Sequence, residues 1–363
     1  MKKNKNYVDL KDQPVPEGQH LLEVDDLKMY FHTEDGVVRA VDGVSYTLDR
    51  GETLGVVGES GSGKSVTAMT IMGLISMPPG KIEGGDVRYR GRSILEMTEE
   101  EMQHIRGNDI AMIFQDPMTS LNPVYKIGKQ VGEGLRLHRG YSKQEALKRA
   151  TELLDLVGIP EPEKRVNEYP HQFSGGMRQR VMIAMALACD PDILIADEPT
   201  TALDVTIQAQ IIELMQEMQE KNGNAIIMIT HDLGVVADMA DKIMVMYAGR
   251  PVEFGTAEEI FYESRHPYTW GLIRSIPEQA IDEKKPLTPI HGNPPSLMNL
   301  PEGCVFSPRC PYATDKCCKQ RPERFVTESG HYSACHYAGD PEFLKNAPVT
   351  SRTRKDSKKG GEA

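Results

Sequence analysis

The segment GESGSGKS at residues 58–65 constrains this chain more than any other. It fits the pattern G-x-x-x-x-G-K-[ST], in which glycines let backbone amides converge on phosphate oxygens. The apolar run 54–57 leads into this loop as a short strand, and a helix follows from Val66, whose positive end attracts an anion. A Gly/Ser surface turn is the alternative, which a strand before and a helix after disfavour. The predicted contacts to a nucleoside triphosphate are Gly58, Ser60, Gly61, Ser62, Gly63, Lys64, Ser65 and Val66.

Within this loop two side chains have distinct expected tasks. Lys64 reaches the β- and γ-phosphates, and the Ser65 hydroxyl ligates Mg²⁺. The unbroken apolar runs 193–196 and 225–230 are typical of strands buried on both faces of a parallel sheet. Residues 21–54 alternate more weakly between glycine turns and predict an antiparallel β layer. The fold class is therefore α/β, with a phosphate-loop core around a parallel sheet.

The chain divides into four parts that differ in composition and residue pattern. Residues 1–20 form a polar N-terminal arm, and 21–262 form the α/β domain with a helical insert at about 96–172. The capping box from Ser142 to Glu145 begins a helix in that insert, which Gly158 ends. Proline and glycine become frequent after about 262, so 263–345 is a small C-terminal extension. Residues 346–363 are expected to be a disordered basic tail.

Composition excludes several classes of protein. The net charge of −11, without a strongly basic face, argues against nucleic acid as the main partner. No run reaches the ~18 apolar residues that a membrane helix needs. The basic start MKKNKN lacks a following apolar run, so it does not predict a signal peptide. We therefore expect the chain to stay in the cytosol, where its six cysteines are free, metal-bound or cluster-bound.

An acidic pair closes the apolar run 193–196. Carboxyl ends of buried parallel strands are where α/β sheets bind ligands. Asp197 is predicted to hold Mg²⁺, largely through water, and Glu198 to polarise the attacking water as general base. A helix N-cap before Pro199 is the alternative. The phosphate loop upstream favours the catalytic interpretation.

A second segment of the sequence also indicates phosphate binding. Ser174, Gly175 and Gly176 begin a helix and predict a second anion site, with Gln179 one turn further on. A second site implies that each γ-phosphate is held by the opposite subunit, whereas a simple Ser-Gly helix start is the alternative.

Gln115 and His231 each follow a predicted sheet strand. A side chain at that end of a strand can reach the γ-phosphate. A lone Gln or His is ordinarily structural, but the position of these two favours a functional role.

In this order, these motifs resemble the nucleotide-binding domain of ATP-binding-cassette (ABC) transporters over residues 21–262. The resemblance implies ATP and Mg²⁺ as cofactors, Gln115 as a Mg²⁺ ligand and link to membrane subunits, and His231 as the switch histidine. It implies that Asp204 of Ala-Leu-Asp 202–204 crosses a dimer interface, and that Phe31 stacks on adenine, with Tyr30 a close rival. The signature departs from L-S-G-G-Q at Phe173 and Met177, leaving the phosphate-contacting Ser-Gly-Gly intact.

The remaining segments narrow the resemblance to ATPase subunits of oligopeptide and dipeptide permeases. They are HPYT at 266–269, GNPP at 292–295, the cysteine-rich run from Gly303, DPMTSLNP at 116–123 and FSGGMRQR at 173–180. That family implies bacterial peptide import from the cytoplasmic face of the membrane. Its partners are two membrane subunits, a paralogous second ATPase and, indirectly, an external peptide-binding protein. Nickel, opine and glutathione importers remain alternatives. A soluble ABC ATPase would normally show long insertions or two fused cassettes.

Four cysteines lie in the loop-like C-terminal sequence: Cys304, Cys310, Cys317 and Cys335. Their spacings exceed the C-x₂₋₄-C pairs usual for structural zinc, so we favour a [4Fe–4S] cluster, with zinc and unligated thiols still open. Peptide-permease ATPases resemble this arrangement. Cys318 is the expected spare and Cys189 a core residue. Because these cysteines are far in sequence from the phosphate motifs, we expect a structural cluster whose loss leaves ATP binding intact.

Overall fold

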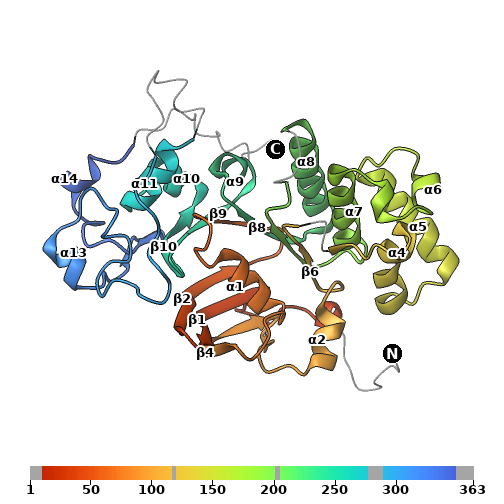
Figure 1. Ribbon diagram of the computed structural model, residues 1–363, viewed down its shortest axis with the longest axis horizontal. Helices are drawn as coiled ribbons and strands as arrows, with labels where there is room; N and C mark the ends of the chain where they lie inside the picture. The colour runs from red at the N-terminus through yellow and green to blue at the C-terminus, as the bar shows by residue number, and fades with distance from the viewer. Residues whose placement is uncertain (1–9, 117–119, 201–204, 277–288, 349–363) are drawn as a thin grey trace.

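The computed structural model describes residues 10–116, 120–200, 205–276 and 289–348. Two sheets organise it (Figure 1). The larger has eight strands in the order β11-β12-β10-β9-β3-β8-β7-β6, and the smaller has four in the order β2-β1-β4-β5. The helical part lies at one end of the larger sheet and the C-terminal extension at the other.

The core of the larger sheet is parallel, as the apolar runs predicted. Every residue of its three central strands is buried, which is why their sequences show no alternation. Neighbouring strands β6, β7, β8, β3 and β9 run parallel, and β10 returns antiparallel to β9. The bounds are β3 Thr53–Val57, β6 Ile110–Ile113, β7 Ile193–Asp197, β8 Ala225–Thr230, β9 Lys242–Tyr247 and β10 Arg250–Thr256.

The antiparallel layer is larger than the sequence indicated. β1 (Leu22–Thr33) and β2 (Gly36–Leu48) lie in the predicted segment, but β4 (Gly80–Tyr89) and β5 (Arg92–Ser93) lie beyond it. β4 pairs with β1 along most of its length. Glycines at both ends of the first half of β4 obscure the alternation of apolar and polar residues by which a strand is recognised. Helix α1 (Lys64–Ile71) packs between the sheets, and its Ala68 and Ile71 belong to the apolar core that both sheets share (Figure 1).

The all-helical part is narrower than the predicted insert at 96–172. Within that range β6 is a strand of the core sheet, and α2 (Glu99–Ile105) packs its Met102 and Ile105 into the core of the antiparallel layer. The capping box at Ser142 and Glu145 is present. The other elements of the predicted insert are α4 Ile127–His138, α5 Lys143–Leu156, α6 Pro162–Arg165 and η2 Pro170–Gln172. Two further helices follow it in the chain, α7 Gly175–Leu187 and α8 Val205–Asn222.

The C-terminal extension is built onto the core sheet. Strand β12 (Tyr332–Ser333) pairs with β10, and β11 (Phe325–Val326) pairs with β12. Phe306 packs edge-on against Tyr247 of β9 inside one shared apolar cluster. The composition change at about 262 is therefore not a break in packing. The other elements are α9 Leu233–Met239, α10 Ala257–Tyr262, α11 Pro267–Arg274, α13 Asp315–Lys319 and α14 Pro341–Leu344.

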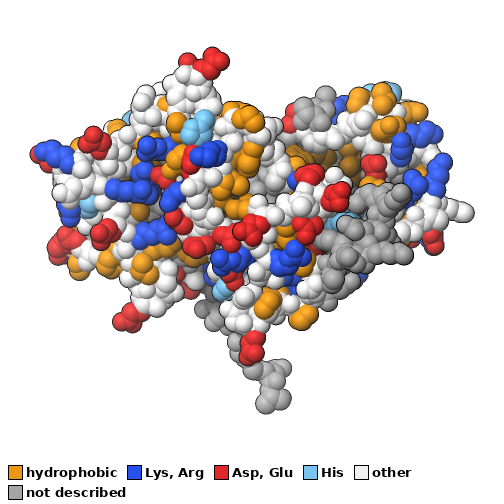
Figure 2. Space-filling view, turned by 90° about the horizontal axis from the view of Figure 1, so that it is seen from below, with side chains coloured by type: hydrophobic (Ala, Val, Ile, Leu, Met, Phe, Trp, Pro, Cys, Tyr) orange, Lys and Arg blue, Asp and Glu red, His pale blue; other side chains and the backbone are white. Residues whose placement is uncertain are grey.

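The sequence predicts a polar arm at the N-terminus and a basic tail at the C-terminus. Leu10, in the short helix η1 (Leu10–Asp12), is buried in the core of the antiparallel layer, so part of the predicted arm packs on the domain. The basic tail 346–363 lies mostly outside the described residues. Among the helices of the described residues, none has the length and apolarity to cross a bilayer. Acidic and basic side chains intermingle on the face that Figure 2 shows.

Candidate functional site

The phosphate loop runs between β3 and α1, and glycine is required at two of its positions. Gly58 and Gly63 have φ angles of 150° and 99°. A Cβ on Gly58 would lie 2.2 Å from the Met246 carbonyl oxygen, and one on Gly63 would lie 2.3 Å from that of Ala40. Gly61 has open space instead, which leaves its backbone approachable. This geometry explains the glycine spacing from which the loop was predicted.

Lys64 is buried at the first turn of α1. Its Nζ donates to the carbonyl oxygens of Gly58 (2.7 Å) and Glu59 (3.0 Å), so the ammonium lies inside the curl of the loop. Burial lowers the pKa of Lys64, and the nearby carboxylates of Glu198, Asp197 and Glu59 oppose that shift. The acidic pair is thus within electrostatic range of the phosphate loop.

Ser65 and Asp197 bring the loop and the end of β7 together. The Ser65 hydroxyl donates to Asp197 Oδ1 at 3.0 Å. Burial raises the pKa of Asp197, while this hydrogen bond acts in the opposite direction. A hydroxyl and a carboxylate are oxygen donors of the kind Mg²⁺ prefers, so the pair fits the predicted metal site.

Glu198 lies between Gln115 and His231. Gln115 Nε2 donates to Glu198 Oε2 at 2.9 Å, and His231 Nδ1 lies 3.3 Å from Glu198 Oε1. Glu198 has a φ of 47°, and its backbone N–H donates to the Ile229 carbonyl of β8 at 2.9 Å. The ends of β6, β7 and β8 therefore deliver Gln115, Glu198 and His231 to one place, as expected for neighbouring parallel strands.

The predicted second anion site lies on another part of the molecule. Ser174 caps α7 by accepting from the Met177 backbone N–H at 3.3 Å, and Gly175 is exposed. Helix α7 packs on α4 and α5, whereas α1 packs on β1, β2 and β7. Ser174, Gly175 and Gly176 are thus presented outward from the helical part.

Gln179 does not lie where the predicted contact with a partner's nucleotide requires it. It is 1% exposed, and its Nε2 donates to the Pro199 carbonyl oxygen at 2.6 Å, so it is not available to a nucleotide on a partner. The reason is packing: Gln179 lies one turn further along α7 than Gly175, where the segment that contains Pro199 covers the helix. Asp204, the predicted interface residue, lies outside the described residues.

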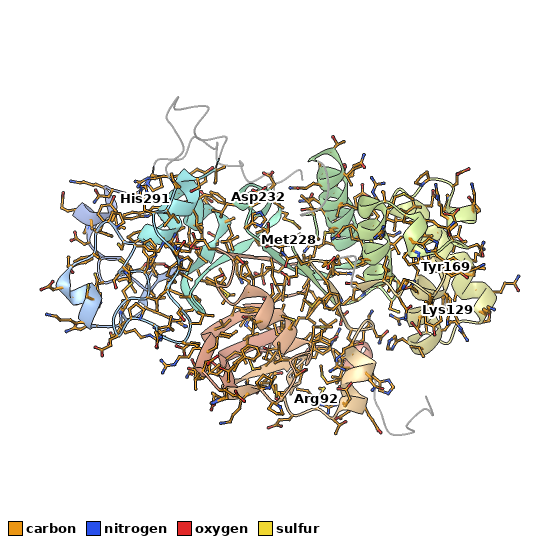
Figure 3. The ribbon with its side chains drawn as sticks, in the orientation of Figure 1. Arg92, Lys129, Tyr169, Met228, Asp232 and His291 are labelled. Atoms are coloured by element: carbon orange, nitrogen blue, oxygen red, sulfur yellow. The ribbon has the colours of Figure 1, made fainter. Side chains whose placement is uncertain are left out.

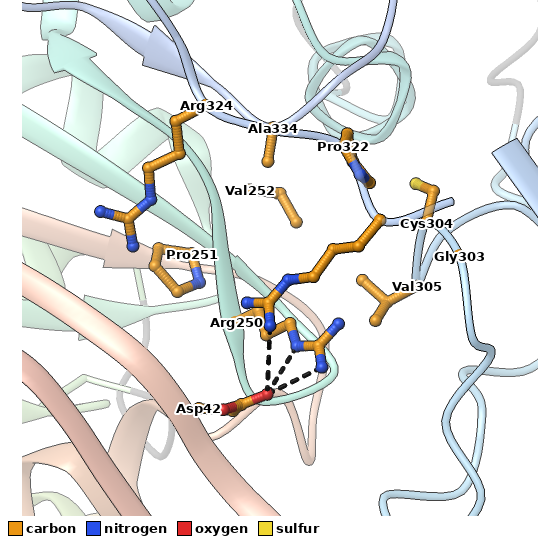
Figure 4. Close-up of a pocket in the computed structure, with 11 residues that line it drawn as sticks. Asp42, Arg250, Pro251, Val252, Gly303, Cys304, Val305, Pro322, Arg324 and Ala334 are labelled. Atoms are coloured by element: carbon orange, nitrogen blue, oxygen red, sulfur yellow. Dashed lines mark hydrogen bonds and ion pairs between the residues drawn. The ribbon is translucent and has the colours of Figure 1, made fainter. Parts of the chain in front are cut away.

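The two candidates for adenine stacking, Phe31 and Tyr30, have different surroundings. Phe31 packs against the apolar cluster that contains Ala68 and Ile71 of α1. The Tyr30 hydroxyl donates to Asp42 Oδ1 at 2.9 Å, and the pKa of Tyr30 is raised to about 12 by burial and that bond. Asp42 also accepts from Arg250 at the edge of a cavity of about 120 Å³ (Figure 4). Phe31 thus shares a core with the helix that follows the phosphate loop.

The four cysteines of the extension line one pocket, together with Phe306 and Tyr312. Burial, with a smaller contribution from the neighbouring cysteines, raises the pKa of Cys310 to about 11 and that of Cys335 to about 12. Cys318 is exposed and Cys189 is buried in the helical core, as predicted. In the described residues, no three His, Cys, Asp or Glu side chains form a group suited to a single metal ion.

Sequence reasoning missed the residues that hold Glu59, inside the loop. Arg309 Nη2 donates to Glu59 Oε1 at 3.0 Å, and the Glu59 backbone N–H donates to the Tyr268 hydroxyl at 2.8 Å. Arg309 is 250 residues away, and no local pattern marks it. Figure 3 shows the three parts of the molecule: Met228 of the core sheet lies between Lys129 and Tyr169 of the helical part on one side and His291 of the extension on the other.

Comparison with known proteins gives two matches to families. Residues 41–201 match the family described as ABC transporter. Residues 252–317 match the C-terminal region of the oligopeptide/dipeptide transporter family. The second match covers three of the four pocket cysteines.

Individual relatives agree. The chain is 58% identical to the oligopeptide transport ATP-binding protein OppD of Bacillus subtilis, over 86% of this chain and 87% of that protein. It is 52% identical to the dipeptide transport ATP-binding protein DppD of Escherichia coli, over 88% of this chain and 97% of that protein. A dimeric ATP-binding cassette solved in a post-hydrolysis state with ADP and Pi superposes with a TM-score of 0.60, at 29% identity, over 65% of this chain and 98% of that one. The chain therefore belongs to the ATP-binding proteins of the oligopeptide and dipeptide ABC transporter family.

Proposed function

We propose that this chain binds and hydrolyses ATP to power peptide import through two membrane subunits. The observation that carries the proposal is the convergence of Ser65, Asp197 and Glu198 beside the phosphate loop. Phosphoryl transfer needs positioning and charge stabilisation more than covalent chemistry, and this edge of the sheet supplies both.

Each residue has a proposed task. The loop amides and Lys64 hold the phosphates, and Ser65 with Asp197 would hold Mg²⁺, which neutralises phosphate charge when bound. Glu198 accepts the proton of the attacking water. Its two oxygens are already directed by Gln115 and His231, which restrict the carboxylate to one orientation. Phe31 is proposed to stack on adenine, with Tyr30 as the alternative.

A complete site requires a second subunit. Ser174, Gly175 and Gly176 face outward at the start of α7 and complete the ATP site of a partner, with Asp204 at the interface. We propose that the partner is a paralogous ATPase. Purification of the transporter from native membranes tests this, and recovery with two copies of this chain alone would contradict the heterodimer.

Attachment to the membrane is proposed to use the segment that follows Gln115 in the sequence. Val124 and Tyr125 are apolar and exposed, 71% and 44%, in the stretch 118–131, of which Met118 and Thr119 lie outside the described residues. Exposed apolar side chains of this kind suit a protein contact. They would receive a short cytoplasmic helix of a membrane subunit, placing the chain at the cytoplasmic face of the bacterial membrane.

Four thiolates from the extension are proposed to hold a [4Fe–4S] cluster. Cys304, Cys310, Cys317 and Cys335 share one pocket, which supports a common ligand. A single tetrahedral zinc would need its sulfurs within about 4 Å of each other. A four-iron cluster accepts a wider set, because each thiolate binds a different iron. Bound, the cluster would crosslink segments that have little apolar core of their own.

Transport by the assembled complex tests the proposed function. The chain, its membrane subunits and the binding protein are reconstituted in vesicles, and uptake of a labelled oligopeptide is measured with ATP inside or outside. Peptide-stimulated ATP hydrolysis with uptake supports the proposal. Stimulation by nickel, an opine or glutathione instead of peptide would reassign the cargo, and hydrolysis independent of any membrane subunit would favour a non-transport ATPase.

A further inference from the structure

Glu59, the second residue of the phosphate loop, is held from three sides. Arg309 Nη1 and Nη2 donate to its two carboxylate oxygens at 2.5 and 3.0 Å. Its backbone N–H donates to the Tyr268 hydroxyl, and its carbonyl accepts from Lys64 at 3.0 Å. Two of these three contacts come from beyond residue 262, so the C-terminal extension fixes the conformation of the loop.

Arg309 is itself held in place by the four-cysteine segment, the part of the extension from Cys304 to Cys335. Residues 304–310 form a tight turn in which the backbone N–H groups of Arg309 and Cys310 both donate to the Phe306 carbonyl at 3.0 Å. The Arg309 side chain is 4% exposed, and it also donates to the carbonyl oxygens of His291 and Ile290. A guanidinium held this way is preorganised for a two-point contact with a carboxylate.

The charge of Glu59 gives this contact its importance. Its carboxylate is close enough to influence the pKa of Lys64, the residue that meets the phosphates. An unpaired carboxylate there would repel a triphosphate through Coulomb interaction, and partial exposure of the Glu59 side chain (30%) would weaken but not abolish that repulsion. Arg309 supplies the opposite charge and fixes the direction in which the carboxylate points.

We propose that Arg309 is a positioning residue for ATP: it neutralises Glu59 and fixes the phosphate loop, and so makes ATP affinity depend on the fold of the four-cysteine segment. This rests on the proposed ATP binding. It reverses the expectation that the cysteines are remote from the nucleotide, because Arg309 directly precedes Cys310. Separation in sequence is not separation in space here.

The test is a double-mutant cycle on the purified full chain, with Mg-ATP affinity measured by titration calorimetry. Arg309→Gln is expected to weaken binding by about tenfold, a typical coupling for a close charge pair. Arg309→Lys should fall between this variant and wild type. Adding Glu59→Gln to Arg309→Gln should restore most of the affinity, since the repelling charge is gone. Arg324→Gln is the matched control: Arg324 also ties the extension to the core, through the Gly43 carbonyl at 2.7 Å, and should leave affinity unchanged.

The single variant Glu59→Gln is the control for misfolding in Arg309→Gln. Arg309→Gln also removes the bonds to His291 and Ile290, whereas Glu59→Gln leaves them and keeps an acceptor for Arg309. We expect Glu59→Gln to bind ATP as well as or better than wild type. Unchanged affinity in Arg309→Gln, a double variant no better than Arg309→Gln, or a tenfold loss in Glu59→Gln would each overturn the proposal. A wild-type chain that binds no ATP would instead refute the proposed function.

Discussion

The Ser65 hydroxyl donates to Asp197 Oδ1 across 3.0 Å, joining the first turn of α1 to the carboxyl end of β7. These residues are 132 positions apart in the chain. The contact exists because β3 and β7 flank β8 in one parallel sheet, so their carboxyl ends share an edge. The neighbouring residue, Glu198, is thereby placed beside the phosphate loop.

Glu198→Gln should bind ATP but turn it over at least ~100-fold more slowly, the usual scale for a lost general base. Glutamine keeps the shape of the side chain and its contact with Gln115 but loses the basicity. Hydrolysis by the assembled transporter measures the effect, and ATP should trap the closed dimer. Glu99→Gln, which alters an exposed carboxylate paired with Arg106, is the control. Near-normal turnover in Glu198→Gln would remove Glu198 from the mechanism.

Gln179→Ala should lower stability rather than ATP affinity. It leaves the buried Pro199 carbonyl without the amide donor, a loss of about 1–3 kcal/mol in the free energy of unfolding. Denaturant unfolding measures it, and the KM for ATP of the assembled transporter serves as the second readout. A raised KM with unchanged stability would return Gln179 to the nucleotide site of the partner.

Serine replacement of Cys304, Cys310, Cys317 or Cys335 should each lose iron, whereas Cys318→Ser and Cys189→Ser should keep it. Anaerobically purified protein should contain about four irons and absorb near ~400 nm, as a thiolate-held cluster does. Iron analysis and absorbance check this. Equimolar zinc without iron would refute the cluster, and transport that changes reversibly with reduction would indicate a redox role.

His266 should make the protein less stable in acid. Burial lowers the pKa of His266 to about 3, and its Nδ1 accepts from the Tyr268 backbone N–H at 3.1 Å, so the folded state keeps it neutral. Below its unfolded value of 6.5 the unfolded chain binds a proton that the folded chain does not. Stability should therefore fall from about pH 6.5 toward 3, by at most about 1.4 kcal/mol per pH unit from this residue. Urea unfolding from pH 7.5 to 5 should show a shallower slope for His266→Gln, and identical slopes would contradict the prediction.

Cysteines at Val124 or Tyr125, in a Cys318→Ser background, should crosslink to a membrane subunit of the assembled transporter. Both side chains are apolar and exposed close to Gln115 in the sequence. Val326→Cys is the control, because Val326 is also apolar and exposed but lies in β11 of the extension. Crosslinks formed only through residues 350–363 would indicate attachment by the tail instead.

The sequence by itself determined the features that depend on neighbours along the chain. The phosphate loop is recognisable because its backbone needs glycine at Gly58 and Gly63, and the buried strands are recognisable because both of their faces are covered. The sequence also showed that Gln115, Glu198 and His231 each follow a predicted strand, and the carboxyl ends of neighbouring parallel strands share one edge of the sheet.

Only the tertiary structure decided what depends on distant partners. Gln179 lies on the buried side of α7, a fact set by the packing of that helix and not by its distance from the signature. Strand β4, whose alternation is obscured by glycines, is set by pairing with β1, where the partners Phe31 and Gly80 are 49 residues apart and Leu22 and Tyr89 are 67 apart. Arg309 reaches Glu59 because the extension shares a core with β9. Side-chain pairing across 250 residues leaves no periodicity in the sequence, since it is fixed by how the layers pack.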